Sequence, residues 1–319
     1  MREQLDIDHI AQHFLERAKS VPKIRTAIVH PCSDDALVGA VSAAREGLIE
    51  PLLVGPQVKI RAIAEQQKLD ITPYTIIDVP HSHAAAAESV RLAKEGRVEA
   101  LMKGSLHTDE LMGEVVKQEN GLRTERRITH VFALASRNYH KPFFVTDAAM
   151  NIEPDLLVKR DIVQNAVDLL IGIHETPIIP KVALLSAVET VNPAMQSTVD
   201  AACLCKMADR GQIKGAILDG PLAFDNAISL EAARVKGIDS PVSGDADIFL
   251  TPDLEAGNML VKQLILLDGA SAAGVILGTR IPIILTSRSD SVQSRIASCA
   301  LAVLMADAMR NGKITYLKV

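Results

Sequence analysis

The feature that most constrains the fold is a regular alternation of short apolar runs with longer segments of helical periodicity. Residues 24–30, with the sequence IRTAIVH, are typical of a buried strand, and residues 34–46 then place apolar side chains on one helix face. Further strands are expected at 51–55, 74–79, 100–103, 127–134, 143–146, 182–186, 215–219, 248–251 and 283–286. Helices are expected at 58–68, 84–95, 108–119, 162–173, 198–211, 257–268 and 292–310. Because such alternation forms βαβ units, the predicted fold class is α/β with mainly parallel sheets.

Composition excludes several classes of function. With 48% hydrophobic residues and a net charge of −5, the chain is globular and lacks the basic surplus of nucleic-acid-binding proteins. The charged, periodic first residues do not form a signal peptide, and 18 uncharged apolar residues never occur in a row. We therefore expect a cytoplasmic protein that binds neither nucleic acid nor membrane.

The four cysteines predict neither a disulfide framework nor a metal site. Cys203 and Cys205 are two positions apart on an expected helix, so their side chains point away from each other. Fingerprints of other common enzymes are also missing. The sequence contains no G-x-G-x-x-G after a strand, no G-x-x-x-x-G-K-[ST], no G-x-S-x-G and no H-E-x-x-H.

The segment TSRSDS at 286–291 follows an expected strand and opens an expected helix, an arrangement that favours phosphate binding. Arg288 supplies a planar fork for phosphate, Ser287 a donor for an oxyanion, and Asp290 a proton acceptor. The alternative is that Ser289 or Asp290 only caps the helix and that Arg288 is a surface residue.

A second turn of the same kind lies at 103–108, with the sequence KGSLHT. Gly104 permits close approach of a ligand, Lys103 offers charge, and Ser105 and Thr108 offer hydroxyl groups. His107 can polarise a carbonyl or hold an anion. The alternative is a capping Thr108 and a surface His107. Two such turns in one chain favour a doubly anionic ligand that bridges them.

Six spaced motifs resemble one enzyme family. They are MKGSLHTDELM (102–112), TDAAMN (146–151), AVETVNPAM (187–195), DRGQIKGAILDGPLAFDNAIS (209–229), ADIFLTPDLEAGN (246–258) and PIILTSRSDS (282–291). Together they are similar to the phosphate acetyl/butyryltransferase family, closest to its phosphate butyryltransferase branch. The resemblance extends from about residue 43 to residue 302.

The resemblance implies a fold like that of isocitrate and isopropylmalate dehydrogenases, with an active site in the cleft between two α/β domains. The first domain would span residues 1–145 and be completed by about 275–319; the second would span 146–274. The reaction implied is the metal-free exchange of acyl-CoA and phosphate with acyl phosphate and CoA, with no permanently bound cofactor. A homodimer or larger homo-oligomer is also implied.

On this interpretation, Arg288 and the 104–108 turn would hold phosphate and Ser287 would stabilise the oxyanion. The family's usual base cannot be carried over, so Asp290 is the nearest candidate base, with Asp219 and Glu189 as rivals. The further candidates for the cleft are Glu189, Asp219, Asn226 and Asn258.

The chain departs from the acetyltransferase pattern of this family at three positions. Pro221 and Ser289 replace residues usual in acetyltransferases, and Ser294 stands where those enzymes carry an Asp. Asp290 matches the butyryl branch, whereas His107 matches the acetyl branch. Either acyl group thus fits the pattern.

Two alternatives belong to other classes. A dehydrogenase of the same fold, dependent on NAD and a divalent metal, would use Asp219, Asp245 and Asp247 as ligands. A sensor that binds acyl-CoA or acyl phosphate without turnover is the other.

Overall fold

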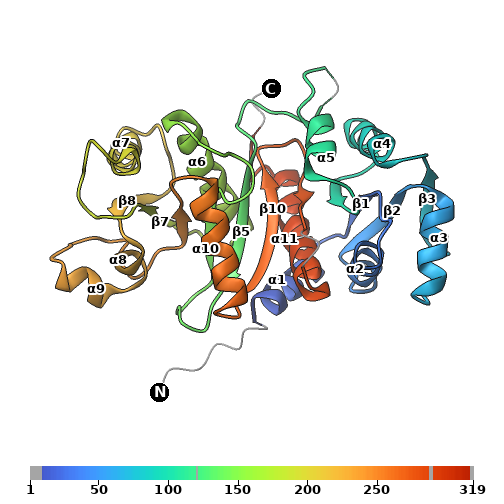
Figure 1. Cartoon of the computed structure of the whole chain (residues 1–319), viewed down its shortest axis with the longest axis horizontal. Coiled ribbons are helices and arrows are strands. Elements are labelled where there is room, and N and C mark those ends of the chain that lie inside the picture. Colours follow the sequence, from blue (N-terminus) through green and yellow to red (C-terminus); the bar gives the residue numbers. More distant parts are fainter. Residues whose placement is uncertain (1–8, 120, 287–289, 317–319) are drawn as a thin grey trace. The chain divides into compact units, whose positions relative to one another are not determined.

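The computed structural model describes residues 9–119, 121–286 and 290–316, which form a mixed α/β protein (Figure 1). Contacts divide the chain into two compact units. The N/C unit contains residues 10–125 and 273–319, and the mid-chain unit contains residues 126–272 with 1–9.

The sheet of the N/C unit has the strand order β3-β2-β1-β4-β11-β10. These strands are β1 (Ile24–Val29), β2 (Ile49–Gly55), β3 (Thr75–Asp78), β4 (Ala100–Lys103), β10 (Ser271–Leu277) and β11 (Ile283–Ile284). All neighbours run parallel except β10 and β11, which are antiparallel. The parallel strands join through helices, as the alternation of patterns predicts.

The helices of the N/C unit are α1 (His9–Lys19), α2 (Asp34–Arg45), α3 (Gln57–Gln66), α4 (Ser82–Lys94), α5 (Thr108–Val115) and α11 (Val292–Arg310). The last helix packs against α2 and is largely buried. Among the described residues, α11 alone is long and apolar enough to cross a membrane, but 72% of its apolar window is buried inside the protein. This burial is typical of a core helix.

In the mid-chain unit the strand order is β5-β6-β9-β7-β8. The strands are β5 (Thr129–Ala135), β6 (Phe143–Thr146), β7 (Lys181–Leu185), β8 (Ile217–Leu222) and β9 (Ile248–Leu250). Only β5 and β6 form an antiparallel pair among them. The helices are α6 (Leu156–Ile173), α7 (Gln196–Asp209), α8 (Phe224–Ile228), α9 (Leu230–Val235) and α10 (Leu254–Leu266).

The mid-chain core is built around aromatic rings despite the low aromatic content of the chain. Phe249 makes edge-to-face contacts with Tyr139 and Phe143, with ring centroids 6.0 Å and 5.4 Å away. The Tyr139 hydroxyl donates to the Ala246 carbonyl at 2.9 Å, which satisfies its one buried polar atom.

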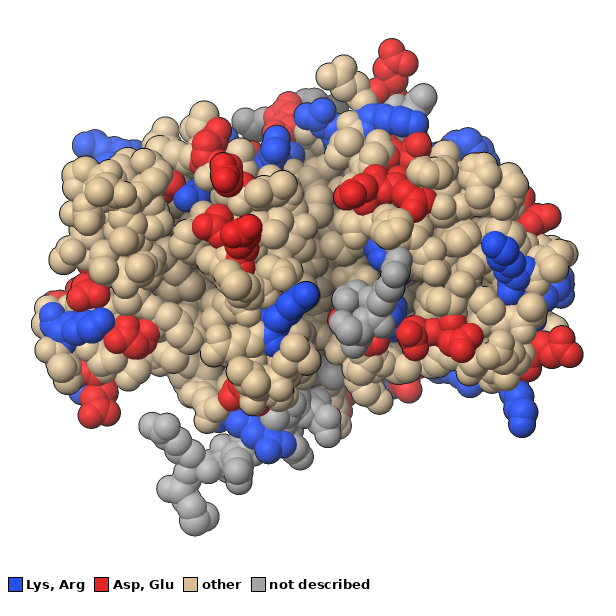
Figure 2. Space-filling view, viewed as in Figure 1, with Lys and Arg blue, Asp and Glu red and all other residues tan. Residues whose placement is uncertain are grey.

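On the face of the molecule in Figure 2, basic and acidic side chains are interspersed.

The unit boundaries differ from the expected domain boundaries of 145/146 and 274/275. The first lies at 125/126, because β6 pairs with β9 and so takes β5 and β6 into the mid-chain unit. The second lies at 272/273, inside β10, a strand that the sequence pattern did not indicate.

Candidate active site

Three strands of the N/C unit bring their carboxyl ends to one edge of the sheet. Val29 of β1 lies opposite Lys103 of β4, and Ile284 of β11 lies opposite Met102 of β4. In open α/β sheets such an edge is where ligands bind. The two turns predicted to bind anions leave this edge from neighbouring strands.

A hydrogen-bonded chain joins the two strand ends. The Thr286 hydroxyl donates to the Lys103 carbonyl oxygen at 3.4 Å and accepts from Nη1 of Arg295 at 2.7 Å. Arg295 comes from α11 and is only 4% exposed. This buried cation behind the strand ends was missed in the sequence because it lies inside an apolar helical pattern.

The turn at 104–108 is held tightly against the end of β1. Gly104 N–H donates to the Val29 carbonyl at 2.9 Å, and Ser105 N–H donates to the His30 carbonyl at 2.8 Å. A Cβ on Gly104 would lie 2.5 Å from the Val29 oxygen and 2.6 Å from the His30 oxygen. Glycine is therefore required at position 104 because the backbone at the end of β1 lies so close to it. The approach of a ligand is not the only reason for glycine there.

Helix α5 begins at Thr108, as the sequence pattern predicts, but its cap lies one residue earlier than expected. Its N-cap is His107, not Thr108, and the His107 N–H donates to Oε1 of Glu110 at 3.2 Å. The Ser82 hydroxyl donates to Oε2 of Glu110, and this hydrogen bond is the main cause that lowers the pKa of the Glu110 carboxyl. The turn is thus fixed from α5 as well as from β1.

The structure bears on Lys103 and on the alternative in which Asp290 caps α11. Lys103 is only 6% exposed, so its side chain is buried and not displayed on the surface. The N-cap of α11 is Ser291, whose hydroxyl accepts from Ser294 N–H at 3.1 Å. Asp290 is therefore not the cap of this helix. Ser287, Arg288 and Ser289 lie outside the described residues.

The mid-chain unit brings together some of the other candidates. Oε2 of Glu189 accepts from Nδ2 of Asn226 at 3.3 Å and lies 3.4 Å from Nζ of Lys236. Asp219 accepts instead from the N–H of Gly220 at 2.9 Å, and Asn258 donates to the Ala148 carbonyl at 3.2 Å. In the part of the chain that the structure describes, Asp219 and Asn258 thus bond to other partners than the Glu189–Asn226 pair.

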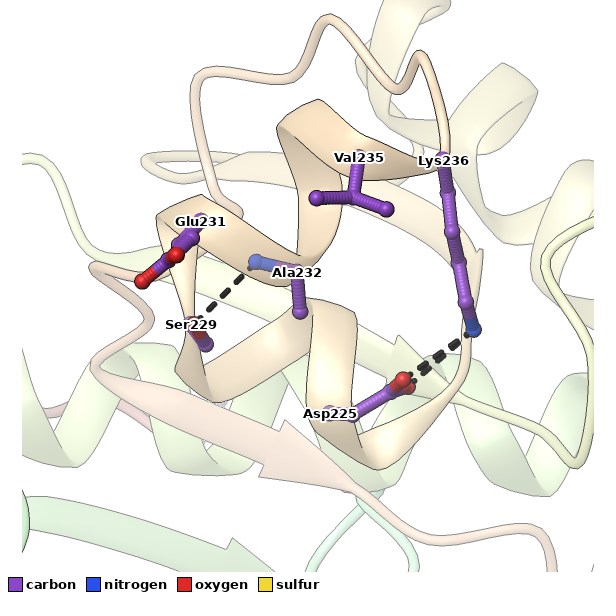
Figure 3. Close-up of a pocket in the computed structure, with 6 residues that line it drawn as sticks. All are labelled: Asp225, Ser229, Glu231, Ala232, Val235 and Lys236. Atoms are coloured by element: carbon purple, nitrogen blue, oxygen red, sulfur yellow. Dashed lines mark hydrogen bonds and ion pairs between the residues drawn. The ribbon is translucent and has the colours of Figure 1, made fainter.

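A pocket of about 330 Å³ adjoins the Glu189–Asn226 pair through Lys236 (Figure 3). Helices α8 and α9 line it with Asp225, Ser229, Glu231, Ala232, Val235 and Lys236. Figure 3 shows Lys236 facing Asp225 across it, as an ion pair of 3.1 Å. This ion pair lowers the pKa of Asp225. With two carboxylates and one ammonium group in its lining, the pocket does not favour an anion.

A buried carboxylate follows β6 in the TDAAMN motif. Asp147 is 2% exposed and accepts from the N–H groups of Ala149 and Met150, each at 3.0 Å, and from Nδ2 of Asn151 at 2.6 Å. Burial raises its pKa despite these hydrogen bonds. A backbone hydrogen bond from His130 of β5 also reaches the Asp147 carboxylate, so Asp147 ties the loop after β6 to the neighbouring strand.

The three aspartates proposed as metal ligands do not assemble. Asp245 pairs with Lys141 and Lys181 at 2.8 Å and 2.6 Å, and Asp247 pairs with Lys141 at 2.6 Å. These lysines lower the pKa of Asp245. Both aspartates precede β9, whereas ligands bind beyond carboxyl ends of strands. Among the described residues, no group of three or more His, Cys, Asp or Glu side chains is placed to hold a metal.

Comparison with known proteins gives a consistent result. The sequence model of the family described as "Phosphate acetyl/butaryl transferase" matches residues 81–303. A phosphate acetyltransferase of Rhizobium meliloti is 58% identical over 291 residues, which cover 91% of each chain. A phosphate butyryltransferase of Clostridium beijerinckii is 40% identical over 294 residues, covering 92% of this chain and 96% of the relative.

A solved structure is also similar. The branched-chain phosphotransacylase from Enterococcus faecalis superimposes with a TM-score of 0.78 and 31% identity, covering 89% of this chain and 99% of that one. With the motifs, the edge formed by β1, β4 and β11, and these matches in agreement, the chain belongs to the phosphate acetyl/butyryl transferase family.

Proposed function

We propose that this protein transfers a short acyl group between CoA and phosphate, so that acyl-CoA and phosphate are exchanged for acyl phosphate and CoA. The observation that carries the proposal is the pairing of β4 with β11. It makes neighbours of the two segments that the sequence singled out for anion binding. Membership of the family supplies the acyl-transfer chemistry.

The chemistry needs an anion site, an oxyanion donor and a proton acceptor. We assign phosphate to Arg288 and the 104–108 turn, where N–H groups at the start of α5 favour negative charge. An oxygen of phosphate attacks the thioester carbonyl, and the Ser287 hydroxyl stabilises the tetrahedral oxyanion. One such donor contributes about 2.7–4 kcal/mol to lowering the barrier.

In the opposite direction the CoA thiol, with a pKa of about 8.5 in water, must lose its proton. The thiolate then attacks the carbonyl carbon of the acyl phosphate, and phosphate leaves. We assign Asp290 as the base, with Glu189 and Asp219 as rivals and Asn226 and Asn258 as further candidates. Ser291 is the N-cap of α11, so the alternative in which Asp290 caps this helix does not hold.

Several coarser features belong to the same proposal. The two units adopt the fold of isocitrate and isopropylmalate dehydrogenases, and the enzyme works in the cytoplasm as a homodimer or larger homo-oligomer. CoA and phosphate are substrates, and no cofactor is permanently bound. The acyl group is acetyl or butyryl, the two named for the relatives in Rhizobium meliloti and Clostridium beijerinckii.

Thiol release from acetyl-, propionyl-, butyryl- and isobutyryl-CoA, with and without phosphate, tests the proposal and ranks the acyl chains. We expect phosphate-dependent release that persists in a chelator, because Asp245 and Asp247 are already paired with lysines. NAD reduction with a 2-hydroxy acid that a chelator abolishes would favour the dehydrogenase. Binding of acyl-CoA without any release would favour the sensor.

A further inference from the structure

His30 has a left-handed backbone conformation, which is uncommon for residues other than glycine. It follows the last residue of β1 with a φ of 55°, in the left-handed region that favours glycine and asparagine. Lys68 is the other residue besides glycine with a positive φ among those that the structure describes. A left-handed backbone alone does not indicate a role, since exposed Lys68 shares it, so the contacts of the His30 side chain decide the question.

The His30 ring is bonded to the proposed phosphate turn. Its Nδ1 lies 2.8 Å from the carbonyl oxygen of Ser105. A carbonyl can only accept, so Nδ1 carries the proton and donates it to this oxygen. In the opposite sense, the His30 carbonyl accepts from Ser105 N–H at 2.8 Å. His30 thus holds both polar groups of one residue in the turn.

The left-handed backbone allows this double contact. The His30 carbonyl also accepts from Cys32 N–H at 2.7 Å, so the chain turns sharply after β1 and the ring can reach across to the neighbouring strand end. Gly104 lets the turn approach closely, and Glu110 holds its other end through His107 N–H at 3.2 Å. Hydrogen bonds therefore hold the turn at both ends, and His30 makes those on the β1 side.

We propose that His30 is a positioning residue of the phosphate subsite. Its ring fixes the orientation of Ser105, and with it the N–H groups that open α5, so that the turn accepts phosphate or the phosphoryl end of an acyl phosphate. The inference deepens the proposed function and rests on it. It assigns to His30 an action through Ser105 and no contact with the substrate.

The substitutions that test it separate backbone from ring. His30→Gly keeps the left-handed conformation and removes the donor. His30→Asn keeps both, because asparagine tolerates this region and its Nδ2 takes the place of Nδ1. His30→Gln places an amide farther out, where Nε2 lies. Lys68→Gly is the matched control, since Lys68 has a φ of 52° and is exposed.

We expect His30→Gly and His30→Gln to raise KM for phosphate about tenfold, the value of one hydrogen bond, with a smaller change in kcat. His30→Asn should restore KM to within about twofold of wild type, and Lys68→Gly should leave it unchanged. The thermal midpoint, measured alongside, shows that each variant is folded. If His30→Gly does not fold, the comparison of Gln with Asn decides.

Two outcomes overturn the inference. In the first, the His30→Asn and His30→Gly variants lose the same activity and the loss is in kcat. This result would indicate that Nε2 of His30 transfers a proton. In the second, KM for phosphate is unchanged in both Gly and Gln variants. Calorimetric titration with inorganic phosphate tests the subsite independently of turnover. If the wild type shows no acyl transfer but still binds phosphate more tightly than the His30→Gln variant, the proposed function is refuted and the role of His30 in the phosphate subsite stands.

Discussion

At Gly104 the limit on side-chain size is set by the backbone of β1. Because a Cβ would lie 2.5 Å from the Val29 oxygen, we expect Gly104→Ala to lower the free energy of unfolding by about 1–3 kcal/mol. The sequence explains Gly104 by the approach of a ligand, and the contact with Val29 adds packing against β1 as a second reason for glycine. Urea unfolding measures the change.

Gly113 provides the control for this prediction. It lies in α5, and a Cβ there would meet no atom within 4 Å. Gly113→Ala should therefore stabilise the protein by about 0.5–1 kcal/mol, because alanine is the better helix former. Equal stability of the Gly104→Ala variant and the wild type would contradict the packing argument.

His130 makes stability depend on pH. Its ring is fully buried beside Phe132, neither ring nitrogen has a hydrogen-bond partner among the described residues, and burial lowers its pKa from 6.5 to about 3. Below pH 6.5 the unfolded chain therefore gains a proton that the folded protein does not take up until about pH 3. The free energy of unfolding falls as the pH falls through this window, by about 1.4 kcal/mol per pH unit.

His130→Leu removes this titration. Between pH 7 and pH 5 we expect the wild type to lose about 2 kcal/mol more than the variant, measured by urea unfolding at both values. Parallel losses in the two proteins would show that the ring is protonated in the folded state or is hydrated.

Among single residues, the sequence indicated the polar residues that directly follow strands. It did not indicate the residues that hold those polar turns in place. The Gly104–Thr108 turn was found because a polar run after an apolar strand is a local pattern. His30 and Glu110 were missed because their roles depend on contacts with segments distant in sequence. Arg295 was missed because it lies inside an apolar helical pattern. The only local signal for His30 is its position before Pro31 at the end of a strand, and this signal was not used to predict a role for His30.

At the scale of elements, the start of α11 separates structural from catalytic roles. Ser291 caps the helix, so Ser291→Ala should lower the free energy of unfolding by about 1 kcal/mol, whereas Asp290→Asn should leave stability nearly unchanged. If Asp290 is the base, Asp290→Asn should slow thiol attack about 10²–10⁴-fold. Thermal midpoints and initial rates for both variants check this.

The result that speaks against Asp290 as base is equally specific. Asp290→Asn with full activity and an unchanged pH profile would move the role to Glu189 or Asp219. Ser291→Ala serves as the comparison, because it disturbs the same helix end without removing a carboxylate.

Elements with a strong local pattern were predicted closely. β4, β6 and α11 have the bounds that their apolar runs and flanking turns indicated. Helix α6 begins earlier than expected, at Leu156, because the Asp155 side chain accepts from Val158 N–H and supplies a cap. The β10 sequence SAAGVIL was missed since alanine and glycine are poor strand formers. Its place next to β11 comes from tertiary pairing.

At the scale of the whole molecule, residues 126–272 supply nearly all of the mid-chain unit as one continuous segment, whereas the N/C unit is built from two long separate segments. Residues 126–272 hold a complete five-stranded arrangement with its own core. Residues 10–125 lack β11, which pairs with β4, and α11, which packs on α2. A fragment of residues 126–272 should therefore unfold cooperatively in urea, whereas a fragment of residues 10–125 should not.

Circular dichroism and limited proteolysis of the two fragments check this prediction. Adding residues 273–319 as a separate peptide should restore protection from protease to the 10–125 fragment. Cooperative unfolding of residues 10–125 alone would show that strands β1 to β4 form a stable sheet without β11 and α11.

The late position of β11 and α11 in the chain sets an order of events during protein synthesis. When the ribosome has made β4 and its turn, the strand that must lie beside them has not been made, and the Thr286 hydroxyl that bonds to Lys103 is still 183 residues away. The mid-chain unit can fold in the meantime, as domains do during translation. The proposed phosphate subsite can form only after β11 and α11 have left the ribosome, so a nascent chain should acquire activity only once residue 310 has emerged.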